Sequence, residues 1–254
     1  AHIGQVGREA EFDLLRAVGA AGVAVPTVRF LLEDADDLGT GFVMDRVEGE
    51  TIARRILRDE TFAAARPRLA GQCGAIAARI HAVPTAALPV LPVQDGPSQI
   101  AFYRSALDAF AEPHPAFELG LRWLEEHAPP PPAEPVLVHG DLRNGNFSHL
   151  GDPVEDLGWL CVRAWRFGID DHLVGGFGDL PDLLEAYAAA GGAPVSEDEV
   201  RWWVVLGTLK WGVICMSQAF THLSGAHRSV ELAAIGRRVA QTEWDILDLL
   251  DGGW

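Results

Sequence analysis

Cysteine is scarce in this chain of 254 residues, and the few cysteines follow no pattern. Cys73, Cys161 and Cys215 lie beside apolar or small residues and have no regular spacing. An odd, unpatterned set argues against a disulfide framework and against a zinc site. We therefore expect buried, reduced thiols, which are typical of a protein from a reducing cytoplasm.

Positive charge is also in short supply. The sequence has 20 basic and 36 acidic residues, which gives a formal net charge of −16. A field of this sign repels a phosphate backbone, so we expect no nucleic-acid partner. The charge keeps a protein soluble, and it does not by itself indicate a cationic substrate or an oligomeric state.

The chain shows no basic segment followed by an apolar run at its start, so the sequence indicates no signal peptide. One long apolar stretch, residues 202–220, contains Lys210 near its middle and has no basic flank. We expect a buried core helix there and no membrane partner. Because a helical pattern opens directly after Ala1, we also expect a preceding segment.

Hydrophobic residues make up 48% of the chain and charged residues 22%, which is typical of a globular protein with a sizeable core. Residues 7–18 have the spacing of an amphipathic helix, and residues 28–32 and 41–47 are typical of strands. A short apolar strand is expected at 136–138. Further along the chain we expect helices at 62–81, 98–110, 116–127, 179–190, 197–220 and 230–250, with a loop-rich stretch before residue 179.

This order of elements predicts an α+β fold with two lobes. Residues 1–49 would form a small, partial β-containing lobe that ends in a hinge near residues 45–49. Residues 50–254 would form a large α-helical lobe. A length of 254 residues accommodates two such lobes around one cleft.

The segment with the clearest chemistry is residues 136–147, VLVHGDLRNGNF. A short apolar strand leads to Asp141, and Asn146 follows five residues later. Phosphoryl transfer to a hydroxyl needs a carboxylate that orients the hydroxyl and accepts its proton, and a neutral oxygen ligand for magnesium. The turn-forming pair Asn144-Gly145 lets the loop fold back, so that both groups can face one cleft.

The segment HGDLRNGN resembles the catalytic loop of the aminoglycoside phosphotransferase family, which is similar to the protein-kinase loop H-R-D-x-x-x-x-N. The resemblance implies a protein-kinase-like bilobal fold and ATP as phosphate donor. It also implies Asp141 as catalytic base, Arg143 near the transferred phosphate and Asn146 as a ligand of Mg²⁺. His139 would be a structural member of the loop. A metal-hydrolase cluster of His139 and His149 is an alternative, but no second His-x-Asp constellation supports it.

The likeness continues after the loop. Residues 148–159, SHLGDPVEDLGW, resemble the family segment G-D-P-x-x-D-L, in which the second aspartate braces the catalytic loop. That aspartate is Asp156 here. Asp152 precedes a proline, a common turn pairing, and we expect a structural role for it.

A weaker likeness lies near the start of the chain. Residues 44–49, MDRVEG, resemble the strand that leads into the adenine-binding hinge. The resemblance implies that Met44, Asp45 and Val47 bind the nucleotide, with the carbonyl of Asp45 and the amide of Val47 reading the adenine edge. Arg8-Glu9-Ala10-Glu11 resembles the helix whose glutamate pairs with an ATP-binding lysine, and we assign that role to Glu9 rather than Glu11.

The acceptor is the least defined part of the prediction. Residues 207–250 resemble a subgroup of bacterial phosphotransferases and domains fused to some acyl-CoA dehydrogenases, which implies a hydroxylated acyl-CoA as the small-molecule acceptor. Aminoglycoside-like compounds are the alternative. Trp165, Arg163 and Arg166 are candidates for the acceptor pocket or for packing. Arg228 is a further basic candidate for an acyl-CoA.

Two parts of the family pattern are missing. No glycine-rich loop and no lysine precede Glu9, and Phe147 runs into Ser148 without the hairpin that carries a second metal-binding aspartate. One explanation is a non-catalytic nucleotide-binding pseudokinase or scaffold that lost magnesium binding. The other, which we favour, is an active enzyme in which flexible segments next to the nucleotide are absent from the sequence as given.

Overall fold

The computed structural model describes residues 6–142, 147 and 149–254. The chain begins with helix α1 (Arg8–Ala20), whose first turn carries acidic residues that favour the helix N-terminus. Strands β1 (Val28–Leu31) and β2 (Phe42–Met44) follow and pair antiparallel, with Leu31 opposite Phe42. A short 3-10 helix, η1 (Asp34–Asp36), lies between them.

This region confirms the predicted helix and two strands. The second strand is shorter than predicted and ends at Met44 rather than at residue 47. The amide of Asp45 still donates to the carbonyl of Thr27 (2.9 Å), but the partner strand begins only at Val28. Residues 45–47 therefore continue past the end of the ladder.

The middle of the chain is helical. The predicted helix at 62–81 is divided into a 3-10 helix and a helix that begins at Arg66, with a proline in its first turn. Helix α4 begins two residues earlier than predicted because the Asp95 side chain caps it, accepting from the Ser98 amide (2.9 Å). The elements are α2 (Ala53–Arg58), η2 (Glu60–Phe62), α3 (Arg66–His81), η3 (Thr85–Ala87), α4 (Gly96–Phe110) and α5 (Pro115–Glu126).

The C-terminal part starts with a short antiparallel pair, in which Val138 lies opposite His149. The second strand of this pair and the helix after it lie in the stretch that we predicted to be loop-rich. The predicted helix at 230–250 is broken after Gly236, which packs tightly against Ala219. The elements are β3 (Val136–Val138), β4 (His149–Gly151), α6 (Val154–Cys161), η4 (Arg163–Trp165), α7 (Leu180–Ala189), α8 (Glu197–Leu223), α9 (Val230–Gly236) and α10 (Val239–Leu250).

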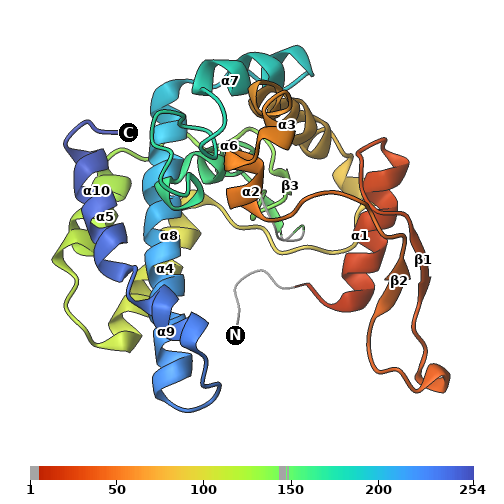
Figure 1. The fold of residues 1–254 in the computed structure, drawn as a ribbon, viewed down its shortest axis with the longest axis horizontal. Coiled ribbons are helices and arrows are strands. Elements are labelled where there is room, and N and C mark those ends of the chain that lie inside the picture. The colour runs from red at the N-terminus through yellow and green to blue at the C-terminus, as the bar shows by residue number, and fades with distance from the viewer. Residues whose placement is uncertain (1–5, 143–146, 148) are drawn as a thin grey trace.

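The long helix α8 is the centre of the larger hydrophobic core (Figure 1). Its buried residues include Trp202, Trp203 and Leu209, which belong to one cluster with residues of α4, α5, α6 and α10. By length and composition α8 is apolar enough to cross a membrane, and 56% of its most apolar window is buried inside the fold. It has the packing that we expected of a core helix.

A second core cluster joins α1 to α3, β3 and Phe147. Leu14 and Val18 of α1 pack with Ile80 of α3, Leu137 of β3 and Phe147. The result is a mostly helical molecule with two small two-stranded sheets, and it confirms the predicted α+β, kinase-like bilobal class. The division into residues 1–49 and 50–254 stays a prediction.

Candidate active site

The loop that carries Asp141 begins where β3 ends. Leu137 and Val138 are fully buried, so the strand holds the start of the loop in the core. Gly140 has φ +75°, a left-handed conformation that glycine adopts without steric cost. A side chain at this position would strain the backbone immediately before Asp141.

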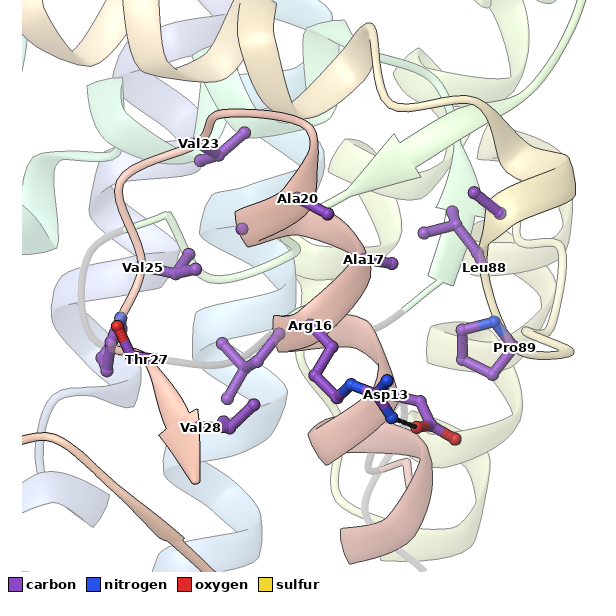
Figure 2. A pocket seen from close by; sticks show the side chains of 14 residues that line it. Asp13, Arg16, Ala17, Ala20, Val23, Val25, Thr27, Val28, Leu88 and Pro89 are labelled. Carbon is purple, nitrogen blue, oxygen red and sulfur yellow. Dashed lines mark ion pairs between the residues drawn. The ribbon is translucent and has the colours of Figure 1, made fainter. Parts of the chain in front are cut away.

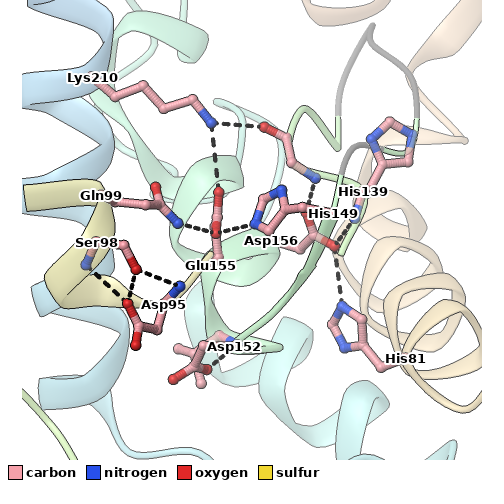
Figure 3. Close-up of polar contacts among 12 residues, drawn as sticks. His81, Asp95, Ser98, Gln99, His139, His149, Asp152, Glu155, Asp156 and Lys210 are labelled. Atoms are coloured by element: carbon pink, nitrogen blue, oxygen red, sulfur yellow. Dashed lines mark hydrogen bonds and ion pairs between the residues drawn. The ribbon is translucent and has the colours of Figure 1, made fainter. Parts of the chain in front are cut away.

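The buried carboxylate of Asp156 fixes this start of the loop. It accepts hydrogen bonds from the amides of His139 and Gly140, both at 2.8 Å (Figure 3). His81 Nε2 lies 3.1 Å from the same carboxylate, and His81 Nδ1 lies 3.0 Å from the Tyr187 hydroxyl. Burial opposes ionisation of Asp156, but the hydrogen bond and charge of His81 outweigh it and hold its pKa below the ordinary value. The brace predicted for Asp156 is confirmed.

Asp141 itself has a partner that the sequence analysis missed. The indole N–H of Trp159 donates to Asp141 Oδ1 at 2.7 Å. Trp159 follows Asp156 by three residues on α6, and that spacing places both side chains on one face of a helix. The signal was present, but it depended on recognising residues 154–161 as a helix.

Lys210 on α8 contacts the same part of the loop. Its ammonium donates to the carbonyl of Gly140 (2.9 Å) and lies 4.6 Å from the centre of the Trp159 ring. It also forms an ion pair with Glu155 (3.6 Å), whose other carboxylate oxygen lies 3.0 Å from His149. Burial opposes ionisation of Glu155, but the His149 hydrogen bond and the Lys210 charge keep its pKa below the ordinary value.

His149 and Asp152, two further polar residues of this region, make contacts that fit structural roles. His149 is buried against Glu155, which fits a packing role better than a hydrolytic metal cluster. Asp152 accepts from the Val154 amide (2.8 Å), and burial raises its pKa. The turn role predicted for Asp152 is confirmed.

Two cavities meet at the residue after Asp141. The first, of about 300 Å³, is lined by Glu11, Met44, Ile76, His139, Leu142 and Phe147 among others. The second, of about 290 Å³, is lined by Glu50, Cys73, Leu142, Trp165 and Phe177 among others. Leu142 lines both cavities. Each approaches the lower end of the size range of ligand pockets, about 300 Å³.

A larger cavity, of about 730 Å³, lies between α1, the chain around Val25 and the segment at Leu88 (Figure 2). None of the predicted site residues lines it. Its two charged lining residues, Asp13 and Arg16, form an ion pair with each other (3.7 Å). A ligand site normally combines an apolar pocket with a few convergent polar groups, so we place the candidate site at Asp141 instead.

The residues predicted to bind the nucleotide near the hinge lie in two different environments, a cavity and the surface. Met44 lines the first cavity, whereas Val47 is 68% exposed and the Asp45 carboxylate is paired with Arg29 at the surface. That guanidinium holds the pKa of Asp45 below its ordinary value.

On α1 the two glutamates face different surroundings. Glu9 is exposed, whereas Glu11 is buried, lines the first cavity and pairs with Arg8 (2.6 Å). The glutamate that faces the cavity is thus Glu11 and not Glu9, to which we had assigned the nucleotide role.

The predictions for Arg143 and Asn146 lie outside the described residues. Within the described part of the chain, no group of three or more His, Cys, Asp or Glu side chains is placed to hold a metal ion. The magnesium site that the resemblance implies, with Asn146 as a ligand, stays a prediction.

Of the acceptor candidates, Trp165 lines the second cavity. Arg163 is held by Asp245 (3.2 Å) and Asp248 (2.8 Å) on α10. Arg166 is 1% exposed and donates to the carbonyl of Cys161 (2.8 Å). Both arginines thus have packing roles, which was the alternative interpretation. Arg228 is exposed in the connection between α8 and α9.

Comparison with known proteins places the chain in a family. The sequence profile of the phosphotransferase enzyme family matches residues 3–149. Acyl-CoA dehydrogenase family member 10 from Mus musculus is 29% identical over 190 residues, covering 62% of this chain and 17% of that protein. Acyl-CoA dehydrogenase family member 11 from Gallus gallus is 30% identical over 172 residues, covering 64% of this chain and 21% of that protein. The chain thus spans about a fifth of the length of these relatives.

Solved structures show the same fold. A candidate aminoglycoside phosphotransferase from Ralstonia eutropha JMP134 has a TM-score of 0.75 at 21% identity, covering 94% of this chain and 82% of that one. A choline/ethanolamine kinase family protein from Mesorhizobium loti has a TM-score of 0.64 at 18% identity, covering 96% and 79%. With its loop motif, its kinase-like fold and its sequence match, this chain belongs to the phosphotransferase enzyme family.

Proposed function

We propose that this protein transfers the γ-phosphate of ATP to a hydroxyl group of a small molecule, with Asp141 as the catalytic base. The observation that carries the proposal is one carboxylate, held by the indole of Trp159, at the residue before Leu142, which lines both cavities. Family membership supports phosphate transfer, and the identity of the donor and the acceptor is our inference.

In this reaction Asp141 orients the acceptor hydroxyl and takes its proton as the oxygen attacks the γ-phosphorus. The bond from that phosphorus to the bridging oxygen of ADP breaks, and ADP leaves. Arg143, two residues along the loop, would lie near the transferred group, and Asn146 would be a magnesium ligand. We expect both assignments from the loop motif alone.

The first cavity is our candidate for the nucleotide. It lies between α1, the end of β2 and α3, and Met44 is one of its walls. An apolar wall of this kind suits a flat adenine ring. We propose Glu11, rather than Glu9, as the acidic residue of α1 on the nucleotide side, because only its side chain lines the cavity.

The second cavity is our candidate for the acceptor. Among the described residues that line it, Glu50 alone is charged, and its carboxylate is already paired with Arg55 (3.2 Å). Burial raises the pKa of the lining thiol Cys73 to about 11, so that this group is neutral. An apolar wall favours an acceptor with an aliphatic part, such as a hydroxyacyl-CoA-like metabolite, over a polycationic aminoglycoside. The relatives named for acyl-CoA dehydrogenases agree with this preference.

Phosphate transfer by the full chain tests the proposal. We expect ADP and a phosphorylated acceptor to form from ATP only in the presence of magnesium, in a panel of hydroxyacyl-CoAs, amino sugars and choline-like amines. Asp141→Asn should abolish transfer while nucleotide binding, measured by calorimetry, is kept. Asp182→Asn, at an exposed position on α7, is the matched control and should behave as the wild type. Wild-type turnover in Asp141→Asn would contradict the base assignment.

A non-catalytic nucleotide-binding module is the second candidate. It is favoured by the pairing of Glu11 with Arg8, which occupies the acidic side chain of α1 that lines the first cavity. This function predicts ATP binding by the wild type with no transfer to any acceptor. The same binding and transfer measurements therefore separate the two candidates.

A further inference from the structure

Two residues that the loop motif does not contain converge on Asp141. Trp159 comes from α6 and Lys210 comes from α8, and Lys210 is the only lysine in the whole chain. We propose that Trp159 and Lys210 form a positioning pair, which holds Asp141 so that its Oδ2 faces the acceptor hydroxyl. The proposal rests on the proposed function and adds the residues that orient its base.

Trp159 acts on the side chain of Asp141. Its indole N–H has a single proton to donate, and it donates to Asp141 Oδ1 at 2.7 Å. The ring is 4% exposed and packs edge-on against Trp165, with the ring centres 5.0 Å apart. Because the ring cannot swing away, one carboxylate oxygen has a fixed position.

Lys210 acts on the backbone before Asp141. Its ammonium bonds to the Gly140 carbonyl (2.9 Å), while the Gly140 amide bonds to Asp156 (2.8 Å). Both polar groups of Gly140 are thus held, at a residue whose left-handed φ aims the chain into the loop. The same ammonium lies over the Trp159 ring at 4.6 Å, a favourable cation–π distance.

A purely electrostatic role for Lys210, as the partner of Glu155, is the simpler alternative. Lys210 Nζ is 3.6 Å from the Glu155 carboxylate, farther than from the Gly140 carbonyl. Glu155 already bonds to Gln99 (2.7 Å) and to His149 (3.0 Å) (Figure 3). The shortest contact of the lysine is therefore the one to the catalytic loop.

These contacts distinguish the two oxygens of Asp141. Oδ1 is committed to Trp159, and Oδ2 has no protein partner among the residues that the structure describes. We assign the proton-accepting role to Oδ2. Trp159 and Lys210 contact neither phosphate nor acceptor in this scheme, so they are positioning residues that act through Asp141.

The first test replaces one atom group. Trp159→Phe keeps an aromatic ring under Lys210 and removes the N–H donor. We expect kcat to fall about 10-fold or more, the size of one charged hydrogen bond, with unchanged KM for ATP and acceptor. Trp202→Phe is the matched control, because it loses an indole bond to the Leu124 carbonyl of α5 (3.0 Å) rather than to Asp141. The control should lower the melting temperature and leave kcat unchanged.

The second test removes the cation. Lys210→Met should lower kcat at unchanged KM, and Lys210→Arg should recover part of the loss. The matched control is Arg201→Met on the same helix, because Arg201 also donates to backbone carbonyls, those of Leu249 and Gly253, and stacks on Trp254 (4.5 Å). The control should not change kcat.

Hydrogen exchange separates failure of this proposal from failure of the proposed function. The amides of His139 and Gly140 should exchange faster in Lys210→Met and Trp159→Phe than in either control, whether or not the protein turns over. If the wild type transfers no phosphate, the proposed function fails and exchange alone decides whether the pair holds the loop. Wild-type kcat in both variants, or exchange equal to the controls, would overturn the positioning pair.

Discussion

The two sides of the candidate site are built in different ways. On the side of α6 and α8, buried carboxylates have several polar partners. Asp156 is hydrogen-bonded to two loop amides and to His81. Glu155 contacts His149, Gln99 and Lys210. On the side of β1 and β2, apolar side chains are exposed, including Phe30, Val43, Met44 and Val47. The start of the loop at Asp141 is thus held by buried contacts, while the proposed nucleotide side is open.

Different interactions hold the two sides in place. Buried hydrogen bonds in a low-dielectric interior are costly to break, so we expect His139 and Gly140 to be held in place without a ligand. Exposed ion pairs such as Arg29 with Asp45 contribute little to stability. We expect the N-terminal side to gain order mainly from a bound nucleotide.

The largest effect is expected at Asp156. Asp156→Ala leaves the amides of His139 and Gly140, and His81, without their buried acceptor. We expect the free energy of unfolding to fall by about 3–5 kcal/mol, the usual cost of breaking a buried charged network. Urea unfolding followed by fluorescence measures it. Asp45→Ala, at the exposed pair with Arg29, is the control on the open side and should leave the midpoint nearly unchanged.

A smaller effect is expected where α6 packs on α8. A Cβ at Gly158 would lie 2.4 Å from the Cβ of Trp203, so Gly158→Ala must push the helices apart. Overpacking of this kind costs about 1–3 kcal/mol, and the displaced α6 should also carry Trp159 away from Asp141. Gly49→Ala is the control, because nothing lies within 4 Å of a Cβ there. Equal melting temperatures for the two variants would contradict the contrast between the two sides.

The smallest effect is expected on the open side, at α1. Glu11→Gln should weaken ATP binding by a few-fold, because this side chain lines the first cavity, whereas Glu9→Gln at an exposed position should not. Isothermal calorimetry with ATP and magnesium measures both affinities. A larger loss in Glu9→Gln would restore our first assignment.

Regular elements of the fold were accessible from local patterns. Helix α1, the strands β1 and β3, and the long helix α8 follow from apolar spacing, which reflects burial of one face or of the whole segment. Strand β4 and helix α6 did not follow. β4 has three residues and is defined only by its pairing with β3. Helix α6 has eight residues, too few to show a helical repeat clearly.

The candidate site, too, was only partly accessible from local patterns in the sequence. The sequence singled out Asp141, because a carboxylate at the end of a strand and its loop partners are adjacent in sequence, and its catalytic role stays a prediction. The choice between Glu9 and Glu11 could not be settled, because two residues of one helix turn differ only in which one faces the neighbouring lobe. Lys210 was assigned only to a core helix, and its acceptor is 70 residues away in the chain.

The sequence by itself determined the kind of protein: a loop motif, a short strand before it and helices after it indicate a kinase-like phosphotransferase. Only the tertiary structure decided how Asp141 and the residues before it are held, through one indole, one lysine and one buried carboxylate from two helices. Motifs record neighbours along the chain, whereas hydrogen bonds and cation–π contacts depend on distances of a few ångströms that folding alone sets.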